Sequence, residues 1–251
     1  MNYKEEIIIS EKKLRKRTLI SFSIFIVLLV AALLAWNRLH QQPKIAGTPG
    51  TLRKGLNFNG TFFSNFLSDD HLAKTYPLSA AVPHVRVNGD AGMENDFDTA
   101  TWKLQVVRNP GDTLFLTMDD IKSLPKTDII FDFKCIEGWS QVTHWAGAKF
   151  SDFMTKYNLN AQTQMNYVGL LTPNKKYYVG IDMRSIMHPQ TLLCYEMNGK
   201  PLPMNQGYPL RLIIPVKYGI KHLKRIGTIY FSNEKPPDYW YERGYDYFSG
   251  L

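Results

Sequence analysis

The run Phe131-Asp132-Phe133-Lys134-Cys135-Ile136-Glu137-Gly138-Trp139-Ser140 joins an alternating apolar segment to a turn that contains glycine. The alternation predicts a strand with one buried face, and Cys135 stands where that strand ends. Two interpretations of this thiol compete. Most free cysteines are small apolar residues of a core, whereas a thiolate held at a strand end can act as a nucleophile or a metal ligand. Local sequence favours the core interpretation, so the decision depends on more distant segments.

The composition predicts one packed domain with an appendage. The chain has 251 residues, of which 44% are hydrophobic and 13% aromatic, and this argues against disorder. A net charge of +8 suits nucleic acid, an anionic membrane surface or an anionic cofactor. Because part of this charge flanks an apolar segment, we expect no nucleic-acid partner. The two cysteines, Cys135 and Cys194, form no disulfide framework, and we interpret Cys194 as a core residue within an apolar strand.

The apolar segment is residues 18–37, TLISFSIFIVLLVAALLAWN, which carries no charge. Twenty residues at ~1.5 Å each span the ~30 Å hydrocarbon core of a bilayer. A cleaved signal peptide or a buried helix is the alternative, but the run is long and its cleavage pattern is poor. Cations are concentrated on the N-terminal side, at Lys12, Lys13, Arg15, Lys16 and Arg17. The positive-inside rule therefore predicts a cytoplasmic tail at residues 1–17, a transmembrane anchor at 18–37 and a body outside the cytoplasm.

Residues 38–80 are predicted to be a tether, and residues 81–251 the folded domain. Periodicity in the tether is broken by Pro43, Gly47, Pro49, Gly50, Gly55 and Gly60. Its apolar residues are too numerous for a pure linker, namely Phe58, Phe62, Phe63, Phe66 and Leu67. This part is therefore expected to pack on the body or on a membrane partner, and the sequence leaves both alternatives open.

The domain is predicted to be a β-rich α+β fold. Alternating or apolar runs predict strands at residues 102–106, 113–116, 128–134, 167–171, 176–181, 210–214 and 226–231. Two short helices are predicted, at residues 120–124 after an Asp119 cap and at 152–157 after a Ser151 cap. The pair Asn198-Gly199 is a strong signal for a hairpin turn.

Two further segments could carry chemistry. In Arg211–Arg225, a strand ends at Pro215, and Lys221, Lys224 and Arg225 would share one face of a helical turn. Cations at such a junction suit a phosphate, although alone they are more often a solvated basic surface. In the other segment His188 precedes Pro189 and could orient a ligand, although a lone histidine is more often structural.

Taken together, these segments resemble the sulfite-oxidase-type molybdopterin-dependent oxidoreductases, over roughly residues 85–243. Four motifs in order carry the resemblance, namely Cys135 with its Gly-Trp-Ser turn, residues 188–193 leading to 198–203, residues 209–215 leading to Lys217-Tyr218-Gly219 and Lys221, and residues 236–240. The segment 84–89 matches the family only in part. The resemblance implies the family's mixed, β-rich molybdopterin-binding fold and a molybdenum–molybdopterin cofactor.

The resemblance also implies roles for single residues. Cys135 would be the thiolate ligand of molybdenum, a soft ligand for this metal. Arg211 and Lys224, with Lys221 nearby, would bind the phosphate of the pterin. Further cofactor contacts are implied at Thr172, His188, Asn205, Gln206, His222 and Leu223. Beside Cys135, candidates for lining the catalytic pocket are Glu137, Trp139 and Tyr218.

The residues after Cys135 distinguish subfamilies. Sulfite oxidases tend to continue with Ala-Gly-Asn-Arg-Arg, whereas this chain has the acid Glu137, which would repel an anion. The run is similar to the catalytic subunits of bacterial protein-methionine-sulfoxide reductases. The resemblance therefore implies oxygen-atom transfer, with reduction of a sulfoxide-like or N-oxide-like small molecule as the expected reaction. Sulfite oxidation is the alternative, and a cofactor-free, membrane-tethered binding module is the alternative from another class.

The resemblance and the charge pattern together predict the cellular setting. We expect a single-pass protein of the bacterial inner (cytoplasmic) membrane whose catalytic domain lies in the periplasm. Because the chain carries no haem motif, electrons would be exchanged with a separate redox partner, such as a membrane or soluble cytochrome.

Overall fold

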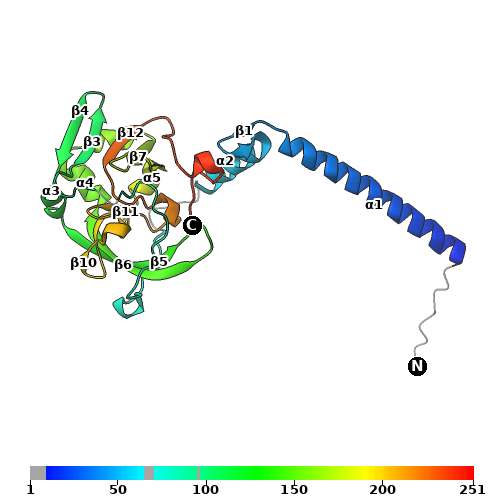
Figure 1. The fold of residues 1–251 in the computed structure, drawn as a ribbon, viewed down its shortest axis with the longest axis horizontal. Helices are drawn as coiled ribbons and strands as arrows, with labels where there is room; N and C mark the ends of the chain where they lie inside the picture. The colour runs from blue at the N-terminus through cyan, green and yellow to red at the C-terminus, as the bar shows by residue number, and fades with distance from the viewer. Residues whose placement is uncertain (1–9, 65–70, 95–96) are drawn as a thin grey trace. The chain divides into compact units, whose positions relative to one another are not determined.

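The computed structural model describes residues 10–64, 71–94 and 97–251 (Figure 1). Phe66 and Leu67 of the predicted tether lie outside the described residues. The chain divides between Arg53 and Lys54 into two compact units, which are treated separately below.

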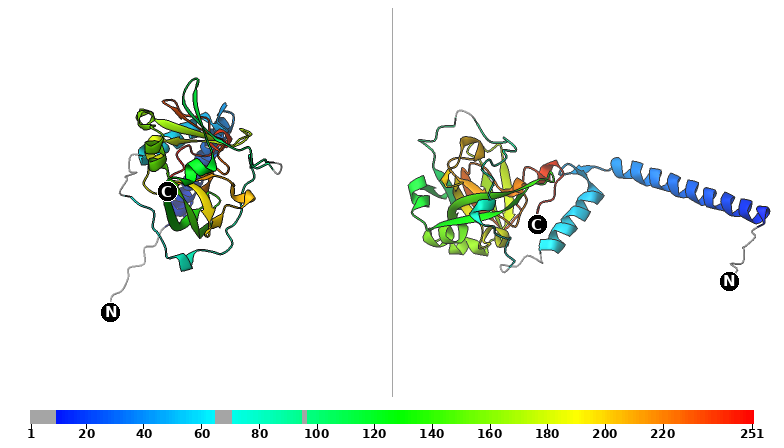
Figure 2. Two further views of the ribbon diagram at one scale, coloured as in Figure 1. Left: turned by 90° about the vertical axis from the view of Figure 1, so that its left-hand side faces the viewer. Right: turned by 90° about the horizontal axis from the view of Figure 1, so that it is seen from below.

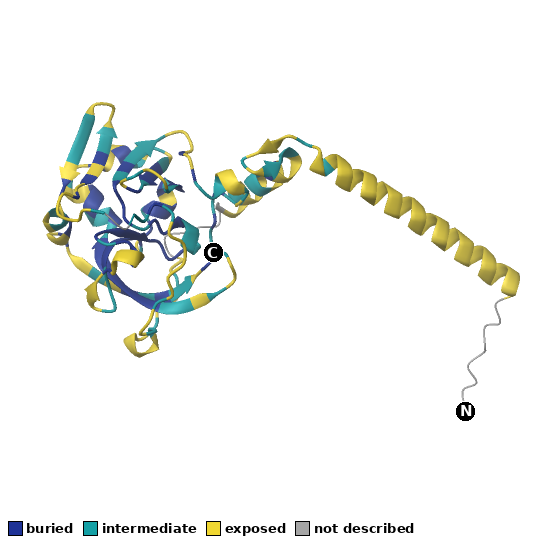
Figure 3. Cartoon of the chain, in the orientation of Figure 1, coloured by how far each residue is buried: buried dark blue, intermediate teal, exposed yellow. Residues whose placement is uncertain are grey.

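The first unit is dominated by helix α1, Glu11–His40, which has no buried residue and contains the predicted anchor (Figure 3). Within the described part of the chain, it is the one helix long and apolar enough to cross a membrane. A short antiparallel hairpin follows, made of β1, Lys44–Ile45, and β2, Thr48–Pro49.

Helix α2, Gly50–Ser64, starts directly after this hairpin and continues into the second unit. The prediction that residues 38–80 lack periodicity is wrong here, because α2 occupies fifteen of them. Glycines usually weaken a helix, but Gly60 has a packing role in this one. A Cβ at Gly60 would lie 3.1 Å from Oδ1 of Asp246, so the absence of a side chain lets the helix approach the C-terminal segment closely.

The second unit contains two five-stranded sheets. The first has the order β10-β9-β6-β5, and β11 pairs with β9. All of its pairs are antiparallel. Its strands are β5 Lys126–Lys134, β6 Ser140–Lys149, β9 Leu192–Met197, β10 Lys200–Pro201 and β11 Arg211–Ile213.

The second sheet has the order β4-β3-β12-β7-β8. Its strands are β3 Leu104–Asn109, β4 Asp112–Leu116, β7 Tyr167–Leu171, β8 Tyr178–Asp182 and β12 Thr228–Ser232. The pair β12–β3 is parallel and the other pairs are antiparallel. Because β12 lies between β3 and β7, the sheet is complete only when the C-terminal third of the chain has folded. Figure 2 shows the ribbon from two further sides.

The helices of the second unit are short. They are α3 Met118–Lys122, α4 Phe150–Lys156 and α5 Met183–Ile186, with 3-10 turns at Leu78–Ala80, Asn160–Gln164, Met204–Gln206, Gly219–Lys221 and Tyr241–Arg243. The predicted caps of the first two are wrong. Thr117 caps α3 in a reciprocal capping box with Asp120, and α4 starts at Phe150 without a side-chain cap, so Ser151 is inside the helix.

The core consists of two clusters, which are reached by alternate residues of the same strands. In β9, Leu193 and Tyr195 join the main cluster with residues of the second sheet, such as Val106 of β3. Leu192 and Cys194 point to the other face and join a smaller cluster. Cys194 is a free, fully buried thiol, and burial raises its pKa to about 12. This environment agrees with its interpretation as a core residue.

The sheet-rich α+β class is confirmed, and each predicted strand overlaps an observed one. The prediction missed β6, whose buried positions include the polar residues Thr143 and His144 and therefore break the apolar pattern. The predicted hairpin turn is confirmed, because Asn198 and Gly199 both have positive φ, 51° and 70°, and connect β9 to β10.

Candidate active site

Cys135 is the first residue after β5, inside a tight turn that leads to β6. The turn is closed by two backbone hydrogen bonds, from Cys135 N to Trp139 O at 2.9 Å and from Gly138 N to Cys135 O at 3.0 Å. Gly138 has a φ of +89°, which explains why glycine stands at this position. The thiol is therefore held by a rigid strand end and a closed turn, as a metal ligand requires.

A pocket opens in front of this thiol. Its empty space, open solvent at the mouth included, is about 870 Å³. Its walls come from six parts of the chain. These are the 85–91 segment, the β5–β6 hairpin, Tyr177, the region of Gln206 and Arg211, the 219–224 loop and the tail at 240–245.

Seven of the residues predicted from sequence line this pocket. They are Cys135, Glu137, Trp139, Gln206, Arg211, His222 and Lys224. The structure thus brings together side chains that are up to 89 positions apart (135 to 224).

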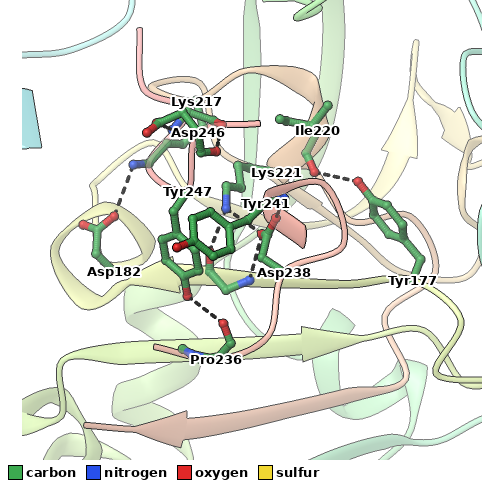
Figure 4. Close-up of polar contacts among 12 residues, drawn as sticks. Tyr177, Asp182, Lys217, Ile220, Lys221, Pro236, Asp238, Tyr241, Asp246 and Tyr247 are labelled. Atoms are coloured by element: carbon green, nitrogen blue, oxygen red, sulfur yellow. Dashed lines mark hydrogen bonds and ion pairs between the residues drawn. The ribbon is translucent and has the colours of Figure 1, made fainter. Parts of the chain in front are cut away.

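Lys221 does not line the pocket, because its ammonium group is engaged elsewhere (Figure 4). Its Nζ lies 2.6 Å from Oδ2 of Asp238 and donates to Gly180 O at 3.0 Å. The helical turn that was expected to align Lys221 with Lys224 ends at Lys221. Lys221 therefore connects the 219–224 loop to the C-terminal tail instead of facing a phosphate.

The other five predicted residues also lie outside the pocket lining. Thr172 and His188 are buried. Thr172 Oγ1 donates to Tyr177 O at 3.1 Å, and His188 Nε2 lies 3.3 Å from His71 O, 117 positions earlier in the chain. Leu223 belongs to the main core. Asn205 is exposed. The backbone N–H of Tyr218 donates to Ser249 O in the C-terminal segment at 3.0 Å.

Arg211 is a buried cation without an acidic partner among the described residues. Its Nη1 donates to the backbone and side-chain oxygens of Gln206 at 3.0 and 2.9 Å, and the guanidinium stacks 4.5 Å from the Trp145 ring. Its Nε is buried and has no hydrogen-bond partner in the described part of the chain. Burial lowers the pKa of Arg211 to about 10, so the group stays charged at neutral pH and lacks a counter-anion.

His222 is a second buried group with an unused ring atom. Its Nε2 lies 3.1 Å from Lys217 O, and a carbonyl can only accept, so Nε2 carries the proton. Nδ1 is then an acceptor, and within residues 10–64, 71–94 and 97–251 it has no partner. Burial, together with the charge of Arg211, lowers the pKa of His222 to about 3, so the ring is neutral.

Lys224 binds the backbone of the segment 84–89, which matches the family only in part. Its Nζ donates to Asn88 O at 2.8 Å and Gly89 O at 2.9 Å, and Gln206 Nε2 donates to Arg86 O at 3.3 Å. Asn88 in turn places its Nδ2 3.7 Å from Sγ of Cys135. Asn88 was not among the predicted site residues. The partial family match at 84–89 was the one feature of the sequence that pointed to it.

The mouth of the pocket combines aromatic rings with one acid. The indole of Trp139 donates to Oε2 of Glu137 at 3.3 Å, and the Arg86 guanidinium lies 4.7 Å from the same ring. Trp240 and Tyr245 also line the pocket, and their ring centroids are 5.1 Å apart. These two aromatic residues and Arg86 were not predicted, because no local pattern connects them to Cys135.

Comparison with known families decides the class of this pocket. Residues 91–240 match the oxidoreductase molybdopterin binding domain family, which is more than half of the chain. The chain is a member of this family. This confirms the resemblance predicted from sequence, and the protein is a molybdenum-dependent oxidoreductase.

Two named relatives agree with this assignment. The molybdopterin oxidoreductase is 32% identical over 195 residues to the putative protein-methionine-sulfoxide reductase subunit YedZ1 of Azospira oryzae, covering 77% of this chain and 73% of the relative. It is 34% identical over 208 residues to the protein-methionine-sulfoxide reductase catalytic subunit MsrP of Campylobacter jejuni, covering 74% and 67%. The sulfane dehydrogenase SoxCD of Paracoccus pantotrophus matches with a TM-score of 0.49 and 16% identity, over 66% of this chain and 46% of that chain.

The family implies a molybdenum–pterin cofactor, and the pocket residues fit such a group. An anionic phosphate would supply the counter-anion that Arg211 lacks and would accept from its free Nε. A donor on the ligand would satisfy Nδ1 of His222. Cys135 offers a thiol at the same pocket, which suits a thiophilic metal.

Proposed function

We propose that this oxidoreductase reduces the sulfoxide group of a small molecule or of an oxidised methionine side chain. The observation that carries the proposal is its identity of 32% and 34% to two proteins named as protein-methionine-sulfoxide reductase subunits. The acid and indole at the pocket mouth, Glu137 and Trp139, are consistent with it because neither favours an anionic substrate.

In this proposal the chain binds and orients the cofactor through a defined set of residues. Cys135 is the protein ligand of molybdenum, Arg211 and Lys224 bind the phosphate, and Gln206 and His222 contact the pterin. The bound group supplies oxygen-atom transfer chemistry that side chains cannot perform. The burial of Arg211 and His222 makes their interactions with a ligand stronger than they would be in water.

The overall reaction sets what else is needed. Reducing a sulfoxide to a thioether breaks one sulfur–oxygen bond, consumes two electrons and two protons, and releases water. The electrons must come from a separate redox protein, for which a membrane or soluble cytochrome is our proposal. The pocket mouth is where the substrate enters, and the rings of Trp139, Trp240 and Tyr245 offer apolar surface for a thioether chain.

We also propose that α1 is a single-pass anchor in the bacterial inner membrane and that the enzyme domain faces the periplasm. The supporting observations are the length and apolar character of α1 and the excess of cations on its N-terminal side. A membrane anchor would keep the pocket near a membrane-bound electron donor.

The test is a substrate screen with the full chain, produced in a host that makes molybdopterin. We expect oxidation of a reduced dye with methionine sulfoxide, free or in a peptide, and no reduction of an oxidised dye with sulfite. Preferential turnover of sulfite would support the alternative reaction. A protein that contains no molybdenum after such expression would contradict the enzyme hypothesis and favour a binding module.

A further inference from the structure

Helix α2 exposes an aromatic surface. Phe58, Phe62 and Phe63 are 68%, 47% and 59% exposed, and we call these three residues the aromatic face. The rings of Phe58 and Phe62 stack with centroids 6.1 Å apart, and those of Phe62 and Phe63 meet edge to face at 5.3 Å. They form one continuous apolar patch on a helix, which in a water-soluble protein would normally be turned inward.

The opposite side of α2 is the one that contacts the enzyme domain. Asn57 lies 3.5 Å from the hydroxyl of Tyr241, and Gly60 is close to Asp246 and Phe248. At about 100° per residue, Phe62 points almost directly away from this polar side. The helix is therefore amphipathic with its polar side on the protein and its apolar side outward.

The start of α2 is tied to the end of α1. The β1–β2 hairpin brings Gly50 back to the linker, where its N–H donates to Pro43 O at 3.2 Å. The amide oxygen of Gln42 accepts from Thr51 N at 3.0 Å, and Arg53 Nη2 donates to Ala46 O at 2.5 Å. Because Pro43 is only three residues after α1, the first turn of α2 lies within about 10 Å of chain from the end of that helix.

We infer that α2 lies on the membrane surface, with the aromatic face in the boundary between lipid headgroups and acyl chains. This inference rests on the proposed anchor, since α2 follows the point where α1 would leave the bilayer. Phenylalanine is one of the residues that form the buried apolar side of helices lying in this boundary. The exposed cations Arg38, Lys44 and Lys54, which are near the junction in sequence, favour anionic headgroups.

The consequence is a fixed distance between pocket and membrane. Because the polar side of α2 contacts the C-terminal segment, a helix held at the surface would hold the enzyme domain there as well. A flexible tether, by contrast, would let the domain sample a wide range of heights. The inference therefore assigns the predicted tether region a positioning role.

The experiment uses the full chain in nanodiscs of zwitterionic and anionic phospholipid, some of it carrying an alkyne on the acyl chain. The photoreactive residue p-benzoylphenylalanine replaces one phenylalanine at a time, at position 58, 25 or 115. Phe25 lies in α1 and reports the anchor itself. Phe115 is the matched control, because it is 60% exposed but belongs to β4 of the enzyme domain.

After irradiation, we expect lipid labelling at position 58 within about threefold of that at position 25 and about tenfold above that at position 115. Labelling at 25 but only background at 58 would overturn the inference and leave the anchor intact. No labelling at 25 would refute both. Cross-linking at 58 to a second copy of the chain would mean that a partner subunit covers the face, which also contradicts the inference. Sulfoxide turnover, measured on the same samples, tests the catalytic proposal independently.

Discussion

Replacing Asp238 with alanine should destabilise the enzyme domain more than the loss of any surface ion pair. Lys221 and Asp238 are only 1% and 2% exposed and lie 2.6 Å apart (Figure 4). Asp238 also accepts backbone N–H groups of Gly180 at 3.2 Å and Tyr241 at 2.9 Å. Without the carboxylate, the partners left to the buried ammonium group among the described residues are the Gly180 carbonyl and the Tyr247 ring, 4.5 Å away.

Breaking a buried pair by removing one partner costs about 3–5 kcal/mol. For a domain of this size, this corresponds to a lowering of the melting temperature by about 6–20 °C. The assay is urea unfolding of the full chain in nanodiscs, followed by tryptophan fluorescence. Since the pair connects the 219–224 loop to the 240–245 tail, and both line the pocket, molybdenum content should fall as well.

Two further variants serve as controls for this prediction. Glu196→Ala removes an exposed pair, Lys126–Glu196 at 2.9 Å, and should cost no more than about 1 kcal/mol. The double variant Lys221→Met/Asp238→Leu should recover at least about 2 kcal/mol of the loss, because no unpaired charge stays buried. The reasoning is refuted if Asp238→Ala costs no more than Glu196→Ala, or if the double variant is as unstable as the sum of its two single changes.

Three further predictions concern single residues. Glu137→Gln should raise turnover of monoanionic substrates relative to neutral sulfoxides by roughly fivefold, because one charge ~8 Å away at an effective dielectric of ~40 contributes ~1 kcal/mol per unit charge. Equal ratios in both enzymes would contradict this. Arg211→Gln should lower cofactor content at least about tenfold without destabilising the cofactor-free protein. A variant that is less stable but binds a normal amount of cofactor would contradict this prediction. Burial, partly opposed by Asp182, lowers the pKa of Lys217 to about 7 from 10.5. The unfolded state then binds more protons between these values, so the free energy of unfolding should rise with pH from 7 to 10.5, and Lys217→Met should flatten that rise.

Much of the site was predictable because it depends on local patterns. Cys135 ends an alternating strand, and the Gly138 turn after it is visible in the sequence. Arg211 lies on a predicted strand, and Lys224 lies in the basic segment after it. Of the residues that the family motifs placed at strand ends or turns, Cys135, Arg211 and Lys224 line the pocket, whereas His188, Tyr218 and Lys221 do not.

The remainder depends on contacts between distant segments. In the sequence Lys221 is one of three neighbouring cations, which predicts a shared binding site. In the structure it binds Asp238, seventeen residues later in the chain. Asn88 contacts Cys135, which is 47 positions later in the chain, and hydrophobic periodicity does not predict such a contact. Helix α2 was not predicted because glycines usually interrupt helices, whereas Gly60 allows the helix to pack closely against Asp246.

The central claim is that the thiol of Cys135 binds molybdenum in this pocket. The most direct test is molybdenum X-ray absorption on the wild type and on the matched variants Cys135→Ser and Cys194→Ser. We predict about one molybdenum per chain in the wild type and in Cys194→Ser, with the same number of sulfur neighbours. Cys135→Ser should show one sulfur neighbour fewer. An unchanged sulfur count in Cys135→Ser, or a wild-type protein without molybdenum, would contradict the account.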